Sequence, residues 1–271
     1  IIPMKKTIVK LIKRVSDLSR SIQNKSEKIK FIHAVDLNLE ASRQIAEQHS
    51  LGLSSDLEDV LDDEKIEAVV LATPHSLHEK QILAAAGAGK HVFCEKPLAL
   101  TRESAEKSVA ACDAAGIVLG LGHERRFEPA MLKIKDLVKS GSLGEIMHVE
   151  ANFSHDKLAN LPADNWRVST TESPAAGMTA TGIHLTDAYM TMFGPVEEVY
   201  AHTARRNPAN LNGDILSFHV RFRSGATGFF NSVLETPIYL RYCVFGSKAW
   251  AEAMDYHHPS EPGPTRFSVS R

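Results

Sequence analysis

The fold class of this chain is decided by residues 68–97, which read AVVLATPHSLHEKQILAAAGAGKHVFCEKP. The run at 68–72 is apolar and rich in β-branched residues, so it predicts a buried strand. Residues 76–88 carry a helical pattern of apolar positions, and residues 91–94 form a second short apolar run. A strand, a helix and a strand in this order predict a βαβ unit, in which a helix joins two parallel strands.

The same alternation extends to both sides of this segment, from residue 28 to about residue 122. The last of its helices begins after Thr101, a residue type favoured as an N-cap, and ends before Gly116. We therefore expect a Rossmann-type α/β domain with a doubly wound parallel sheet, over residues 1–122. Further strands are expected at 30–35 and 117–121, and further helices at 38–49 and 102–115.

Beyond His123 the pattern changes to two helical stretches, at 129–140 and 178–192, and a series of period-two strands. Residues 216–223 alternate strictly between apolar and polar side chains, as in a strand with one covered face. This second half, residues 123–271, is therefore expected to be an α+β domain with a largely antiparallel open sheet. The apolar positions are Leu216, Phe218, Val220 and Phe222, and the polar positions are Ser217, His219, Arg221 and Arg223.

Composition excludes several classes of protein. Of 271 residues, 43% are hydrophobic and 24% are charged, which is typical of globular proteins. A net charge of −2 leaves no basic excess, so neither nucleic acid nor an anionic membrane is an expected partner. The apolar runs are too short to cross a bilayer. Three cysteines at no metal or redox spacing, Cys94, Cys112 and Cys243, predict a cytoplasmic protein without a disulfide framework.

The residues that follow the predicted strands are candidate site residues, because ligands bind beyond the carboxyl ends of the strands in an open α/β sheet. Asp36 follows the strand at 30–35, where an acid accepts hydrogen bonds from the ribose of an adenine dinucleotide. The alternative is that Asp36 caps the next helix. Lys96 precedes Pro97, which restricts its backbone and raises the chance of a cis peptide bond. A lysine held there can transfer a proton, and the alternative is a solvated loop residue.

Two motifs at a fixed spacing, ATPHSLH at 72–78 and GKHVFCEKPLA at 89–99, closely resemble the Gfo/Idh/MocA oxidoreductases. The resemblance continues through RRF at 125–127, SGSLGEI at 140–146 and GIHLTD at 182–187, and covers about residues 28–255. Members of this family dehydrogenate or reduce sugars and cyclitols with a nicotinamide cofactor, and they form dimers or tetramers through the sheet of the second domain.

The resemblance implies that Lys96 and His184 contact the reacting carbinol. Hydride leaves a carbinol carbon only as the hydroxyl proton is withdrawn, so a base must lie within hydrogen-bond reach. Histidine suits this role near neutral pH, and Lys96 can stabilise the developing alkoxide. The alternative for His184 is a core histidine on a buried helix. We expect the cofactor to contact Asp36, Thr73, Pro74, His78, Glu95, Lys96 and Pro97.

Four further residues, Arg126, His155, Trp166 and Arg167, are candidates for the substrate wall. An aromatic face stacks on sugar C–H groups, and a guanidinium binds hydroxyls or a carboxylate. For Trp166 and Arg167, packing within a loop is the alternative.

A metal site is not expected. His75, His78 and Glu79 lie close together in the sequence, but they lack a fourth ligand at a known spacing. His257 and His258, next to Pro259, are typical of an exposed loop.

The sequence departs from the family at the glycine-rich turn that follows the first strand. If that strand is 7–12, the three glycine positions hold Lys13, Val15 and Leu18. Glycine admits positive φ and close approach of the backbone to a pyrophosphate, so side chains here should crowd the site. Three explanations stay open: a degenerate site, an altered N-terminus, or a loop that binds through Lys13 and Arg14.

A second departure is Ala180, one helical turn before His184, where family members often have an aspartate. Thr179 and Thr181 point elsewhere on a helix. Asp187, three residues after His184, either orients that histidine or makes a structural hydrogen bond. The chain also ends in a short strand at 265–270 without the final helix of the family, so we expect a truncated C-terminus.

Two functions follow from these residues. The first is an NAD(H)-dependent oxidoreductase that acts on a carbinol of a sugar, inositol or related polyol, with NADP(H) disfavoured because Asp36 would repel a 2′-phosphate. The second is a non-catalytic relative that senses a sugar or nucleotide, which the lost glycines and Ala180 favour.

Overall fold

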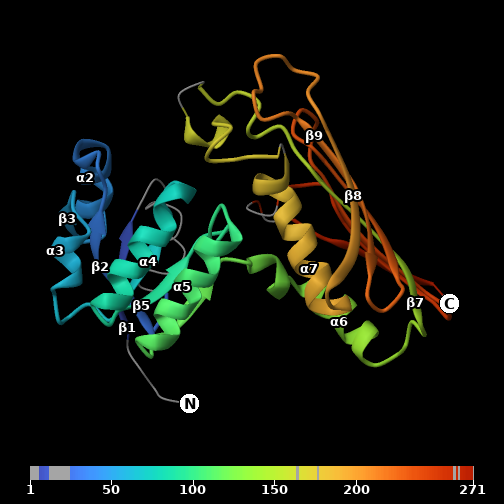
Figure 1. The fold of residues 1–271 in the computed structure, drawn as a ribbon, viewed down its shortest axis with the longest axis horizontal. Coiled ribbons are helices and arrows are strands. Elements are labelled where there is room, and N and C mark those ends of the chain that lie inside the picture. The colour runs from blue at the N-terminus through green and yellow to red at the C-terminus, as the bar shows by residue number, and fades with distance from the viewer. Residues whose placement is uncertain are drawn as a thin grey trace. The chain divides into compact units, whose positions relative to one another are not determined.

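The computed structural model describes residues 6–11, 25–162, 165–175, 177–258, 261 and 263–270. The chain forms two compact units, Ile1–Gly122 and His123–Arg271, and each is built on its own sheet (Figure 1). In the part of the chain so described, no helix is both long enough and apolar enough to traverse a bilayer.

The first unit contains a six-stranded sheet in the order β3-β2-β1-β4-β5-β6, and every neighbouring pair is parallel. This is the strand order of doubly wound dinucleotide-binding folds, so the predicted Rossmann-type class is confirmed. The strands are β1 (Lys6–Leu11), β2 (Ile29–Val35), β3 (Gly52–Ser54), β4 (Ala68–Leu71), β5 (His91–Cys94) and β6 (Leu119–Leu121). The helices are α2 (Leu39–Gln48), α3 (Glu58–Leu61), α4 (His78–Gly87), which follows the 3-10 turn η1 (His75–Leu77), and α5 (Arg102–Ala114).

Local sequence signals explain these elements. All four residues of β4 are buried, as expected of a central parallel strand covered on both faces. The hydroxyl oxygen of Thr101 accepts a hydrogen bond from the Ser104 N–H at 3.2 Å, so the predicted cap of α5 is confirmed. Gly116 follows that helix with φ of 64°, in the left-handed region that favours glycine. β3 and α3 were not predicted, because three or four residues are too short to show periodicity.

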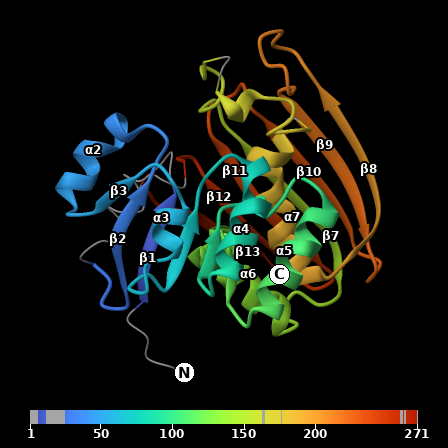
Figure 2. The same ribbon diagram turned by 60° about the vertical axis from the view of Figure 1, so that its left-hand side comes forward.

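The second unit contains a seven-stranded sheet in the order β13-β12-β11-β7-β10-β9-β8 (Figure 2). Its pairs are antiparallel, with the exception of β10 and β7, which run parallel. The predicted, largely antiparallel sheet is therefore confirmed. The strands are β7 (Ile146–Ser154), β8 (Val196–Ala204), β9 (Ile215–Phe222), β10 (Thr227–Val233), β11 (Tyr239–Gly246), β12 (Trp250–Asp255) and β13 (Arg266–Ser270).

One face of this sheet is covered by the helices α6 (Pro129–Lys139) and α7 (Ile183–Phe193) (Figure 1). Apolar side chains of both helices join the core of the sheet. The alternation predicted for β9 is observed, since Leu216, Phe218, Val220 and Phe222 are all buried. The opposite face carries the polar residues of β9 and has no helix against it among the described segments.

The helix expected at 178–192 differs in its first turn. Residues Met178–Gly182 form a π-helical turn, named η4, before α7 begins. The backbone there lies close to the sheet, since a Cβ added at Gly177 would collide with the Ser232 hydroxyl. The Thr181 hydroxyl lies 2.5 Å from the same oxygen. These contacts hold the wider turn, and π turns are frequent at functional sites.

Candidate functional site

Asp36 stands at the carboxyl end of β2. Its Oδ1 accepts a hydrogen bond from the Asn38 N–H at 2.9 Å, and its Oδ2 accepts one from the Ser42 hydroxyl at 2.6 Å. The N-cap of α2 is Asn38, whose side chain accepts the Ala41 N–H at 3.0 Å. The interpretation of Asp36 as the helix cap is therefore wrong. Each carboxylate oxygen retains a lone pair for a further donor, which fits a ribose hydroxyl.

Thr73 and Pro74 follow β4. The Thr73 hydroxyl donates to Oε1 of Gln81 at 2.6 Å, which ties this loop to α4. His78, the first residue of α4, is fully buried. Its Nδ1 lies 2.8 Å from the Pro97 carbonyl oxygen, and its Nε2 lies 3.2 Å from the Thr73 carbonyl oxygen. His78 thus connects the two motif loops of this unit.

Two of the three residues considered as metal ligands, His78 and Glu79, are engaged in other contacts. Both ring nitrogens of His78 face carbonyl oxygens, and Glu79 accepts a hydrogen bond from Lys107 at 2.6 Å. Within the described ranges, no group of three histidine, cysteine, aspartate or glutamate side chains is arranged to hold a metal ion.

Lys96 follows β5 directly. The Glu95 N–H donates to the Leu71 carbonyl of β4 at 2.8 Å, so the sheet ladder extends to the residue before the lysine. The Lys96–Pro97 peptide is cis, Lys96 is half-buried and Pro97 is buried. The side chain of Glu95 lies against Gly122, where an added Cβ would stand 3.2 Å from Oε2.

The parallel sheet brings the predicted cofactor residues of this unit to one edge. Asp36, the Thr73–Pro74 loop and the Glu95–Pro97 loop follow β2, β4 and β5, and all three strands point the same way. This edge fits an adenine dinucleotide, with an acid in the ribose position and two short loops beside it. The turn that contains Lys13, Val15 and Leu18 lies outside the described residues.

His184 lies in the first turn of α7 and is buried. Its ring centroid is 6.0 Å from that of Phe153 on β7, and 6.4 Å from that of His123, whose ring is perpendicular to it. His184 therefore lies between the helix that carries it and the covered face of the sheet.

Phe153 is the centre of a cluster that the sequence did not reveal. Besides His184, its ring contacts His155 at 5.5 Å and His258 at 6.4 Å between centroids, and the Arg125 guanidinium lies 5.3 Å from its centroid. His155, predicted to line the substrate wall, is buried here. The only signal for Phe153 was its inward position in the alternation of β7.

His258 is not the exposed loop residue that was predicted. It is half-buried, and its ring centroid lies 5.5 Å from that of His155. Burial, together with the neighbouring Lys157, His155 and Arg125, lowers the pKa of His258 to about 4. This histidine is therefore neutral at physiological pH, when its ring offers one donor and one acceptor.

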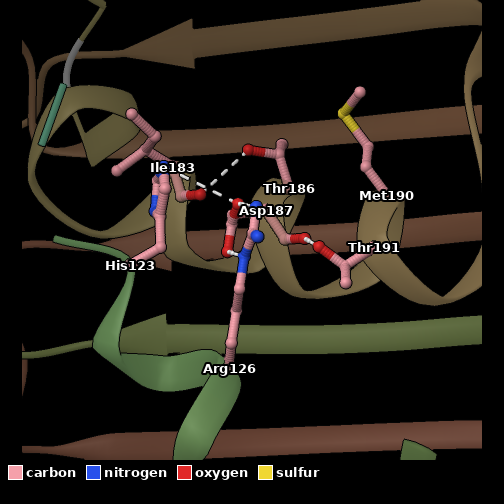
Figure 3. Close-up of a pocket in the computed structure, with 7 residues that line it drawn as sticks. All are labelled: His123, Arg126, Ile183, Thr186, Asp187, Met190 and Thr191. Atoms are coloured by element: carbon pink, nitrogen blue, oxygen red, sulfur yellow. Dashed lines mark hydrogen bonds and ion pairs between the residues drawn. The ribbon is translucent and has the colours of Figure 1, made fainter. Parts of the chain in front are cut away.

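Arg126 forms a two-point ion pair with Asp187 of α7 (Figure 3). Its Nε donates to Oδ2 at 2.6 Å and its Nη2 donates to Oδ1, and these hydrogen bonds raise the pKa of Arg126. His123 Nε2 lies 3.6 Å from the same Oδ1. Asp187, whose side chain is 8% exposed, thus orients Arg126 and His123. These three residues line a hollow of ≈ 380 Å³ with Ile183, Thr186, Met190 and Thr191.

Trp166 and Arg167 form a one-turn 3-10 helix, η3 (Trp166–Val168), and stack on each other. The Arg167 guanidinium carbon lies 4.1 Å from the Trp166 ring centroid. Asn212 donates to the Ser169 carbonyl at 3.1 Å and holds the end of this turn. These contacts support the alternative of packing within the loop.

The turn before His184 offers no acid, in agreement with the departure noted at Ala180. The Thr179 hydroxyl donates to the Pro174 carbonyl at 2.6 Å, and the Thr181 hydroxyl donates to the Gly177 carbonyl at 3.0 Å. Both hydroxyls therefore serve the packing of η4.

Each of the two units is similar to a known protein family. Residues 14–123 match the family model described as an oxidoreductase family with an NAD-binding Rossmann fold. A 1,5-anhydro-D-fructose reductase of Ensifer adhaerens is 29% identical over 209 residues, which cover 76% of this chain and 62% of that protein. A scyllo-inositol 2-dehydrogenase (NADP(+)) of Bacillus subtilis is 33% identical over 148 residues, which cover 54% of this chain and 40% of that protein. The chain thus spans less than two thirds of either relative.

Among solved structures, the WlbA dehydrogenase from Bordetella pertussis, in complex with NADH and UDP-GlcNAcA, superimposes with a TM-score of 0.85 at 26% identity. The match covers 92% of this chain and 78% of that one. Residues 131–252 match the model of the GFO/IDH/MocA C-terminal domain. With a matching model for each half, the chain belongs to the Gfo/Idh/MocA family.

Proposed function

We propose that this protein is an NAD(H)-dependent oxidoreductase that transfers hydride between a nicotinamide and a carbinol of a sugar, inositol or related polyol. The first unit would bind the dinucleotide, and the second would bind the substrate. The observation that carries the proposal is the position of Lys96, directly after β5 at the sheet edge that also carries Asp36. The names of the relatives, a sugar reductase and an inositol dehydrogenase, support this substrate class.

In this proposal, the bound nicotinamide supplies or accepts the hydride, and the chain manages the proton at the carbinol oxygen. His184 takes the hydroxyl proton in the oxidation direction, and the Lys96 ammonium stabilises the negative charge that develops on the same oxygen. The aromatic ring of Phe153 packs against His184 and excludes water from one side of the imidazole.

The substrate wall is proposed to include His155, next to His184 around Phe153. We add His258, because its neutral ring offers hydroxyl groups both a donor and an acceptor. Arg126, Trp166 and Arg167 stay proposed contacts. The guanidinium of Arg126 is committed to Asp187, so it would contribute its outer N–H groups, and Arg167 would contribute through its stack on Trp166.

The first test is cofactor binding by calorimetry, followed by turnover on a panel of sugars and inositols. NAD(H) should bind more tightly than NADP(H), because the Asp36 carboxylate repels a 2′-phosphate. Asp36→Ala should bring the affinities for NAD(H) and NADP(H) closer together. Glu40 is an exposed acid on α2, and the control Glu40→Ala should leave the ratio of the two affinities unchanged. The cofactor preference has to be measured on this chain, since one relative is named as an NADP(+) enzyme. Equal affinities for both dinucleotides would overturn the assignment of Asp36.

A second candidate function is that of a non-catalytic sensor of a sugar or nucleotide. The absence of an acid among residues 178–182, where family members often place one, favours it. NAD(H) binding without turnover on any sugar or inositol would support the sensor and contradict the oxidoreductase.

We also propose that the protein forms a dimer or tetramer through the uncovered face of its second sheet. Arg241 on this face forms ion pairs with Glu150 and Glu252 at 2.6 Å, and the exposed side chains of Tyr200, on the edge strand β8, and Trp250, on β12, add apolar surface. Such faces are commonly buried in symmetric oligomers. Light scattering should give at least twice the chain mass, and Tyr200→Glu should shift the mass toward the monomer. A monomer at high protein concentration would refute the proposal.

A cytoplasmic location completes the proposal. All three cysteines are free and buried, as in proteins of reducing compartments.

A further inference from the structure

The backbone of Lys96 is held on both sides by elements that precede it in the sequence. On one side, the Glu95 N–H donates to the Leu71 carbonyl of β4 at 2.8 Å. On the other side, the Pro97 carbonyl oxygen lies 2.8 Å from Nδ1 of His78. The first contact belongs to the sheet ladder, but the second depends on one side chain of α4.

His78 has no access to solvent, since its side chain is fully buried. Its Nδ1 contact to Pro97 is shorter than the 3.2 Å contact between Nε2 and the Thr73 carbonyl. A neutral imidazole has a single N–H and can donate to only one of these two acceptors. The shorter distance makes the Pro97 carbonyl oxygen the better-placed acceptor for that N–H.

We propose that His78 is a positioning residue for Lys96: its Nδ1–H holds the Pro97 carbonyl and thereby fixes the backbone from which the lysine reaches the carbinol. The inference rests on the proposed function, because it concerns the geometry of the same lysine. It assigns His78 a role in the alignment of a reacting group, in place of the direct cofactor contact expected from the sequence. Such alignment matters, since a misplacement of about 1 Å can cost about 100-fold in rate.

Two substitutions distinguish the contribution of the Nδ1 hydrogen bond of His78 from that of the Nε2 contact. The amide nitrogen of asparagine reaches the position of Nδ1, so His78→Asn retains a donor toward the Pro97 carbonyl. The amide nitrogen of glutamine reaches the position of Nε2, so His78→Gln retains a donor toward the Thr73 carbonyl. We expect kcat to stay within about threefold for His78→Asn and to fall about 10- to 100-fold for His78→Gln. The KM for substrate and the Kd for NAD(H) should change by less than about threefold in both variants.

The matched control is His33→Asn on β2, because the amide of asparagine does not reach the position of Nε2. His33 belongs to the same unit and contacts the Ser54 hydroxyl through Nε2 at 3.1 Å, but it contacts neither motif loop in the interactions described above. This variant should lower Tm without changing kcat. If both His78 variants lose kcat in proportion to their loss of Tm, or if neither loses kcat, the positioning role is wrong.

A second measurement needs no turnover. ¹⁵N NMR of the unmodified protein should show His78 with its proton on Nδ1, and an unprotonated Nδ1 would overturn the inference. An unmodified protein that shows this tautomer but turns over no substrate would contradict the proposed function and leave the hydrogen bond established. A protein that turns over substrate with the opposite tautomer would contradict only the inference.

Discussion

Alanine in place of Lys96 or His184 is expected to lower kcat by about 10²- to 10⁴-fold, with a change in NAD(H) affinity of no more than a few-fold. Both side chains are proposed to act on the carbinol oxygen in the transition state, and neither is proposed to hold the adenine half of the cofactor. Steady-state kinetics and calorimetry measure the two quantities separately. Lys80 is an exposed lysine on α4, and the control variant Lys80→Ala should leave kcat unchanged.

The double variant tests whether the two residues act together. If each needs the other at one oxygen, the loss in the double variant should be much smaller than the product of the two single losses. Multiplicative losses would show that Lys96 and His184 act at separate steps or places. Full activity of His184→Ala across sugars and inositols would remove the mechanism.

Alanine in place of Tyr189 is expected to lower the free energy of unfolding of the second unit by about 3–5 kcal/mol, the cost of removing a fully buried aromatic ring. Tyr189 lies on α7, five residues after His184, and packs against Phe193, Phe230 and Tyr242. Its hydroxyl donates to the Glu150 carbonyl at 2.8 Å and lies 3.2 Å from the Cys243 carbonyl.

Tyr189→Phe isolates the contribution of these hydrogen bonds. It should cost only about 0.5–1.5 kcal/mol, because the ring stays in place and the hydrogen bonds alone are lost. Urea unfolding followed by tryptophan fluorescence reports on this unit, since both tryptophans, Trp166 and Trp250, belong to it. Equal losses for the two substitutions would mean that the hydrogen bonds, and not the packing, attach α7 to the sheet.

Local signals in the sequence were sufficient for the fold class. The apolar runs of β4 and β5, the Thr101 cap of α5 and the alternation in β9 each depend on residues within about one turn or one strand of each other. The parallel pairing of β10 with β7 was not predictable in this way, because it joins segments about 80 residues apart with no periodic signature.

In the candidate site, too, some features follow from local sequence and others depend on the folded chain. Lys96 and His184 were proposed from motifs of adjacent residues, and Asp36 from its place after a strand. The contacts within the site were not predicted, because each contact joins side chains that only the folded chain brings together. Asp187 binds Arg126, 61 residues earlier, and His258 packs on His155, about 100 residues earlier.

By itself, the sequence determined the fold class of each half and which residue types follow the predicted strands, since periodicity, caps and motifs are properties of neighbouring residues. Only the tertiary structure decided what each of those residues contacts. His78 shows the physical reason: its ring is buried between two carbonyl oxygens, from Thr73 and from Pro97, which lies 19 residues later. A buried ring must satisfy its N–H within the protein, and the available acceptors depend on how β4, α4 and β5 pack in three dimensions.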